Sequence, residues 1–189
     1  MGKIFCLETE WNKSKHDLKY KSSAQSLLEF LENSKGIQYT FRNVATETDF
    51  EYYIHHLYYD SYKLYDIVYL CFHGEKSNIE FANRTHIDLL EFAKNNPGIF
   101  EGKNVHFGCC STLAITEDDI KLFKKESGAR MVSGYAVDVE FINSFVFELW
   151  LLNAISENPQ YAGKRICDLA HSRMPYYAQK HYCPVKVDK

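Results

Sequence analysis

The sequence lacks the features that mark membrane, nucleic-acid-binding and zinc-binding proteins. Its longest apolar runs fall well short of the eighteen or so residues that a membrane-spanning helix requires. Its 22 basic side chains do not outnumber its 25 acidic ones, so no excess of positive charge suits it to nucleic acid. No two of its six cysteines have the Cys-x-x-Cys spacing of common zinc sites, so we expect no structural metal.

At the start of the chain we expect no secretion signal, because the apolar run Ile4–Leu7 is too short for the core of one. We therefore expect a cytoplasmic protein whose cysteines are reduced. The nine glycines are scattered, and no glycine-rich phosphate-binding loop appears. There is no repeat, low-complexity segment or Pro/Gly-rich linker, so we expect one domain that spans residues 1–189.

Apolar strands and helices alternate along the 189 residues. The predicted strands are Lys3–Leu7, Ile37–Val44, Ile67–Phe72, Ile79–Phe81, Asn104–Gly108 and Arg130–Tyr135. The predicted helices are Ser23–Ser34, Thr46–Tyr58, Ile87–Lys94, Glu117–Ser127, Phe141–Glu157 and Ile166–Gln179. We expect the last one to be kinked or broken before Pro175, and we expect Asn12–Lys21 to be a loop. This order predicts an α/β fold, with a mostly parallel central sheet and helices on both faces.

Such sheets bind ligands beyond the carboxyl ends of their strands, and two of these ends carry chemically active residues. The buried strand Ile67–Phe72 runs directly into His73 and Gly74. Histidine is suited to proton transfer near neutral pH. Glycine lets a substrate backbone approach, and its N–H group can point at an oxyanion.

The second strand end carries thiols. Asn104–Gly108 is followed at once by Cys109 and Cys110. A cysteine becomes a nucleophile when a nearby base or a lowered pKa yields the thiolate. If the two strands are parallel neighbours, His73 and this cysteine pair lie within reach of each other.

In this order the segments resemble the caspase-like cysteine peptidases, and among them most closely the bacterial CHAT domains. Those domains run a hydrophobic strand into His-Gly, continue through a short hairpin and a helix, and end a later strand in a Cys-x-Thr turn. Residues Ser77–Phe81 and Asn83–Leu89 match the hairpin and the helix start, and residues 110–112 match the turn. The segment 130–138 resembles the family's Ser-Leu-Trp-x-Val-Asp segment, so the resemblance covers roughly residues 64 to 155.

The resemblance implies a three-layer caspase-like sandwich and a cysteine endopeptidase. By position it assigns the nucleophile to Cys110, proton transfer to His73, and the oxyanion hole to the N–H groups of Gly74 and Cys110. Peptide bonds would be hydrolysed through a thioester, with no metal and no cofactor. The expected partners are a protein or peptide substrate and a partner protein that activates the enzyme.

Two assignments stay open. The Cys-x-Thr turn selects Cys110 as the nucleophile, whereas the Gly-Cys-Ser pattern of separases would select Cys109. Many members of this group carry an acidic pocket and prefer Arg or Lys before the scissile bond, and Asp138, beside Glu140, is the candidate carboxylate here. The alternative for Asp138 is a solvated turn that caps the helix from Phe141.

Two other functions suit the same fold class. One is a catalytically inactive caspase-like scaffold or regulatory partner, which the presence of both His73 and a well-placed cysteine disfavours. The other is a TIR-like signalling domain, which the early strand and the helix Ser23–Ser34 suit but which the missing phosphate loop disfavours.

Overall fold

The computed structural model of the chain describes residues 1–11, 23–161 and 163–177. Its centre is a sheet with the strand order β2-β1-β3-β7-β8, and every neighbouring pair is parallel. These strands are β1 (Lys3–Glu8), β2 (Tyr39–Asn43), β3 (Tyr65–Cys71), β7 (Asn104–Phe107) and β8 (Met131–Gly134). The parallel central sheet that the sequence predicts is confirmed.

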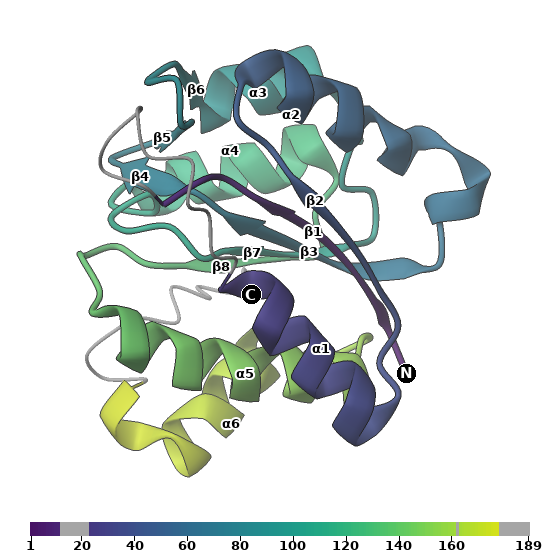
Figure 1. Cartoon of the computed structure of the whole chain (residues 1–189). Coiled ribbons are helices and arrows are strands. Elements are labelled where there is room, and N and C mark those ends of the chain that lie inside the picture. Colours follow the sequence, from purple (N-terminus) through teal and green to yellow (C-terminus); the bar gives the residue numbers. More distant parts are fainter. Residues whose placement is uncertain (12–22, 162, 178–189) are drawn as a thin grey trace.

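Helices cover both faces of this sheet and give three layers (Figure 1). The helices are α1 (Ala24–Lys35), α2 (Glu47–Ile54), α3 (Leu89–Asn95), α4 (Glu117–Ser127), α5 (Phe141–Glu157) and α6 (Gly163–Arg173). In Figure 1, α2, α3 and α4 lie above the sheet, and α1, α5 and α6 lie below it. Each face has its own cluster of buried apolar side chains. None of the described helices is long and apolar enough to span a bilayer.

Strand β3 is the central strand and is buried on both faces. Val68 and Leu70 pack into the core beneath α2 to α4, whereas Ile67 and Tyr69 pack into the core against α1 and α5. The near-continuous apolar sequence of this strand follows from that position, because side chains alternate between the two covered faces. Burying each large apolar side chain contributes roughly 1.5–3 kcal/mol to stability.

A second, antiparallel sheet leaves the carboxyl end of β3. It contains β4 (His73–Glu75), β5 (Asn78–Glu80) and β6 (His86–Asp88), in that order. The expected helix Ile87–Lys94 begins later than predicted, because Ile87 pairs with Ile79 in this sheet. Asp88 then caps α3 by accepting hydrogen bonds from the N–H groups of the next turn.

Several predicted boundaries agree with the structure. Helices α4 and α5 have the predicted bounds, and Gly36 ends α1 with φ +70°, a conformation that favours glycine. The expected break before Pro175 is present, since α6 ends at Arg173 and residues 175–177 are helical again. Helix α2 is shorter than predicted and continues as 3₁₀ turns. The expected loop Asn12–Lys21 and the end of the last helix lie outside the described residues.

Candidate active site

The ends of β3 and β7 lie side by side. The two strands are hydrogen-bonded neighbours, with Leu70 paired to Phe107. The N–H group of Gly108 then donates to the carbonyl of Leu70 at 2.8 Å. The chain segments that follow these strands, one carrying His73 and the other Cys110, therefore start from the same edge of the sheet.

The hairpin that begins with His73 is fastened to the cysteine turn. The N–H group of Ser77, at the hairpin tip, donates to the carbonyl of Thr112 at 3.1 Å. The hydroxyl of Thr112 donates in return to the carbonyl of Asn78 at 3.2 Å. The hydroxyl of Ser77 also donates to Asp88 at 2.7 Å, which connects the hairpin to the cap of α3. These bonds fix the hairpin against the turn that carries Cys110.

Gly74 is the point of closest approach between the two segments. A β-carbon at position 74 would overlap the hydroxyl of Thr112 and the carbonyl oxygen of Cys110, and it would lie 2.9 Å from the β-carbon of Cys109. Position 74 therefore requires glycine for lack of space. From the sequence, the expected role of Gly74 is to let a substrate approach. The structure shows a second reason for glycine, which is its close contact with the cysteine turn.

His73 and Cys110 line one cleft with a volume of about 390 Å³. Clefts of this size are typical of sites for small molecules or for a few side chains of a peptide. The other lining residues are Trp11, Phe72, Gly74, Glu75, Glu80, Arg84, Gly108, Val139, Phe141 and Ser144. The structure thus brings together the histidine and one of the two cysteines that the sequence singles out.

Burial lowers the pKa of His73, which is half-buried. The carboxylate of Glu80 and a hydrogen bond to the backbone of Glu10 act in the opposite direction, whereas the nearby charge of Arg84 lowers the pKa further. The ring of Trp11 packs edge-on against the imidazole, with 5.0 Å between ring centroids. A lowered pKa leaves the imidazole neutral near pH 7, in the form that accepts a proton.

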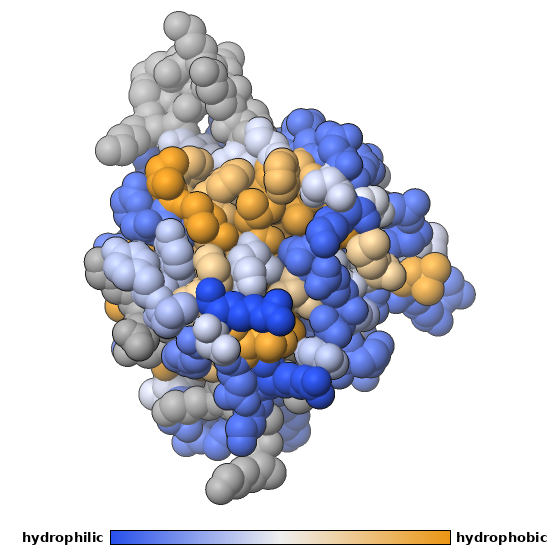
Figure 2. Space-filling view, turned by 90° about the horizontal axis from the view of Figure 1, so that it is seen from below, coloured by the Kyte–Doolittle hydropathy of each residue, from blue (hydrophilic) through white to orange (hydrophobic). Residues whose placement is uncertain are grey.

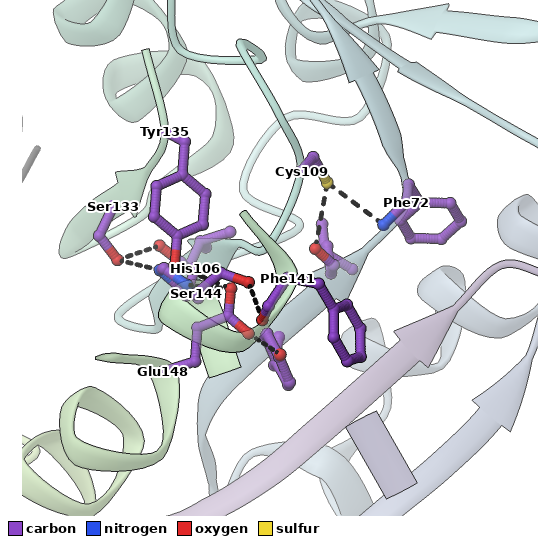
Figure 3. Close-up of polar contacts among 11 residues, drawn as sticks. Phe72, His106, Cys109, Ser133, Tyr135, Phe141, Ser144 and Glu148 are labelled. Atoms are coloured by element: carbon purple, nitrogen blue, oxygen red, sulfur yellow. Dashed lines mark hydrogen bonds and ion pairs between the residues drawn. The ribbon is translucent and has the colours of Figure 1, made fainter. Parts of the chain in front are cut away.

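The two cysteines have different environments. Cys109 is 1% exposed, and its thiol donates to the carbonyl of Leu70 at 3.2 Å and accepts from the N–H group of Phe72 at 3.3 Å (Figure 3). Burial raises the pKa of the Cys109 thiol far above its ordinary value. Cys110 is partly exposed and faces the cleft, with its sulfur 3.9 Å from the carbonyl oxygen of Val139. Cys109 therefore ties β7 to the end of β3, and Cys110 is the thiol that a molecule in the cleft can reach.

The turn after Cys110 is held by the segment that follows β8. Ser111 has φ +53°, and its N–H group donates to the carbonyl of Val137 at 3.1 Å. Its hydroxyl donates to the carboxylate of Asp138 at 2.7 Å. Asp138 is exposed and lies outside the set of residues that line the cleft. Asp138, the carboxylate that the sequence suggested for the substrate pocket, thus binds Ser111 and does not line the cleft.

Sequence reasoning missed a buried acidic residue beside the cleft. Glu148, in the middle of α5, is 6% exposed and accepts hydrogen bonds from the hydroxyls of Tyr69 and Tyr135, the latter at 3.0 Å (Figure 3). The ring of His106 lies beside it, with Nε2 3.7 Å from the carboxylate and Nδ1 2.9 Å from the hydroxyl of Ser133. A carboxylate inside the otherwise apolar run 145–152 was the available signal.

Comparisons with known proteins agree with this architecture. No curated protein matches the sequence. The crystal structure of Caspase-1 from Spodoptera frugiperda is similar, with a TM-score of 0.51 and 14% identity over 95% of this chain and 82% of that chain. This similarity confirms the caspase-like α/β fold that the sequence resemblance implies, and at this identity it bears on the fold alone. Residues 2–163 match a family model described as a family of unknown function, DUF6642, and the chain therefore belongs to that family.

Proposed function

We propose that this protein is a cysteine endopeptidase with Cys110 as nucleophile and His73 as its proton acceptor. The observation that carries the proposal is the shared cleft, which a histidine and a partly exposed thiol line from two neighbouring parallel strands. A neutral imidazole can take the proton of the Cys110 thiol as the sulfur attacks a peptide carbonyl. The imidazolium then gives that proton to the leaving amine, and water hydrolyses the resulting thioester.

The oxyanion formed in this attack requires hydrogen-bond donors. We assign these to the backbone N–H groups of Gly74 and Cys110. In support, the N–H group of Cys110 has no hydrogen-bond acceptor among the described residues. The close contact of Gly74 with the turn keeps its backbone next to Cys110. No metal or cofactor is needed for this chemistry.

Within the caspase-like enzymes, the order of motifs favours the CHAT type, and the substrate is then a protein or peptide. We propose that a basic residue precedes the scissile bond. Two carboxylates near the site are candidates for its recognition. Asp138 is held next to the cysteine turn through Ser111, and Glu148 is buried behind the cleft.

Mass spectrometry of a peptide library incubated with the protein tests the proposal. The native chain should produce new peptide termini, and His73→Ala should produce none while it keeps the native melting temperature. His86→Ala is the matched control, because His86 is an exposed histidine in strand β6 of the same small sheet. A native chain that cleaves nothing, or a His73→Ala variant that cleaves as fast as the native chain, refutes the peptidase function.

An inactive caspase-like scaffold is the second candidate, and one observation favours it. Helix α5 exposes Phe141, Ile142 and Val146, which are 55%, 61% and 37% exposed. Figure 2 shows apolar surface on the face that carries α1, α5 and α6. Apolar surface of this kind is typical of contacts with other proteins. A scaffold would cleave no peptide, so the library experiment separates the two functions.

A further inference from the structure

A smaller pocket opens from the cleft towards α5. It has a volume of about 40 Å³, and four of its lining residues also line the cleft. These shared residues are Trp11, Gly108, Phe141 and Ser144. Since Gly108 lies two positions before Cys110, the pocket begins close to the proposed nucleophile. The other residues lining the pocket are Ser23, Tyr69, Cys71, Phe145 and Glu148.

Glu148 places a buried carboxylate in this pocket. Its side chain is 8% exposed, and the hydroxyls of Tyr69 and Tyr135 donate to it (Figure 3). Burial raises the pKa of both tyrosines well above the ordinary value, so both keep the protons that they donate. These bonds hold the carboxylate in one position, but neutral hydroxyls do not cancel its charge.

No cationic side chain among the described residues pairs with Glu148 apart from the adjacent histidine. The ion pairs of the described residues give it no lysine or arginine partner. His106 Nε2 lies 3.7 Å away and makes no hydrogen bond. A buried carboxylate without a cation is costly, and a positive group that enters the pocket would offset that cost.

The missing side chain at position 108 leaves the path to Glu148 open. A β-carbon there would lie 3.1 Å from Oε1 of Glu148 and 3.0 Å from the ring of Tyr69. Any larger residue would therefore fill the space between the cleft and the carboxylate. Gly108 thus connects the proposed nucleophile with the buried charge.

We infer that this pocket receives the side chain that precedes the scissile bond, and that Glu148 selects a lysine there. The inference rests on the proposed peptidase function and assigns its substrate class. A lysine ammonium is compact, close to the size of a water molecule, and a pocket of about 40 Å³ has room for it. The planar guanidinium of arginine is larger than an ammonium group and needs more room than this pocket offers, so the pocket favours lysine over arginine.

Cleavage of matched peptides tests the inference. The peptides carry lysine, arginine or norleucine before the scissile bond, since norleucine has the four-carbon chain of lysine without the terminal ammonium group. The native chain should prefer lysine over both, and Glu148→Gln should reduce the lysine-to-norleucine ratio of kcat/KM roughly 30-fold or more. Asp138→Asn tests the competing assignment and should leave that ratio unchanged. The inference would be overturned if the lysine-to-norleucine ratio fell in Asp138→Asn but not in Glu148→Gln. Equal cleavage after lysine and norleucine by the native chain would also overturn it.

A binding measurement separates this inference from the peptidase function. N-acetyl-lysine amide should shift NMR signals of the pocket residues in the Cys110→Ala chain, and N-acetyl-norleucine amide should not. Gly108→Ala, which fills the path and keeps Glu148, should abolish the lysine response even if Glu148→Gln proves too unstable to study. Lysine binding without any peptide cleavage would refute the peptidase and keep the pocket assignment. Cleavage after neutral residues, with no lysine binding, would keep the peptidase function and refute the pocket assignment.

Discussion

The backbone of Gly74 packs against the carbonyl group of Cys110, and this contact joins two motifs that are distant in the sequence. A hydrogen bond between Ser77 and Thr112 reinforces it from the tip of the hairpin. The histidine segment and the cysteine turn are therefore positioned by each other as well as by the sheet. The distance between His73 and Cys110, the two proposed catalytic residues, thus depends on a position that carries no side chain.

Gly74→Ala should disrupt this arrangement. The added methyl group meets backbone, which cannot move aside as a flexible side chain can, so we expect the free energy of unfolding to fall by about 1–3 kcal/mol. A shift of the turn by about 1 Å should reduce kcat/KM on the order of 100-fold.

Gly36→Ala is the control for this substitution, and urea unfolding and peptide cleavage are the measurements. Nothing lies within 4 Å of a β-carbon at position 36, although its φ of +70° is unfavourable for alanine. This variant should lose about 1 kcal/mol of stability and no activity. Native activity in Gly74→Ala would show that the contact does not position the site.

The two adjacent cysteines should differ in reactivity. The buried thiol of Cys109 has a raised pKa and is 1% exposed, whereas Cys110 faces the cleft. Iodoacetamide should therefore alkylate Cys110 roughly tenfold faster or more in the folded chain, because the reagent needs an accessible thiolate. Fragmentation of the peptide that contains both residues gives the two rates. In urea the rates should converge, and faster labelling of Cys109 in the folded chain would count against the assignment.

The acid limb of the pH–rate profile should report on His73. The proton acceptor must be neutral, so kcat/KM falls as the pH drops through its pKa. Since the pKa of His73 is lowered, this fall should lie below the ordinary histidine value of 6.5. Arg84→Gln removes a charge that lowers this pKa and should move the fall to higher pH. Glu80→Gln removes a charge that raises it and should move the fall to lower pH.

Profiles of the two variants that shift together, or that coincide with the native profile, would show that His73 is not the titrating group. The exposed ion pair between Arg84 and Glu80 makes the two substitutions a matched pair. Each variant removes one charge of this pair and keeps the other, so the two shifts should have opposite signs.

Much of the fold follows from the sequence because local patterns and burial agree. The apolar run of β3 requires two covered faces, and α5 begins and ends where its apolar run does. The Thr116–Asp119 capping box likewise sets the start of α4. The hairpin β4–β5 was harder to predict, since its strands have three residues each and depend on contacts with the cysteine turn.

The chemistry of the site was predictable only in part. Strand order placed His73 and the cysteine pair at one edge, but burial, which a sequence does not show, distinguishes Cys110 from Cys109. The role expected of Asp138 came from its place after a strand, and its bond to Ser111 depends on the turn geometry. Glu148 was missed because its partners Tyr69 and Tyr135 come from two other strand segments.

The central claim is that Cys110 carries out peptide hydrolysis, and the turnover of two cysteine variants tests it most directly. A library peptide cleaved by the native chain should remain intact with Cys110→Ala, because the nucleophile is lost while little volume is removed. Cys109→Ala should still cleave it, after correction for the folded fraction, since that thiol only ties two strands together. Native turnover by Cys110→Ala would contradict the account, whichever way Cys109→Ala behaves.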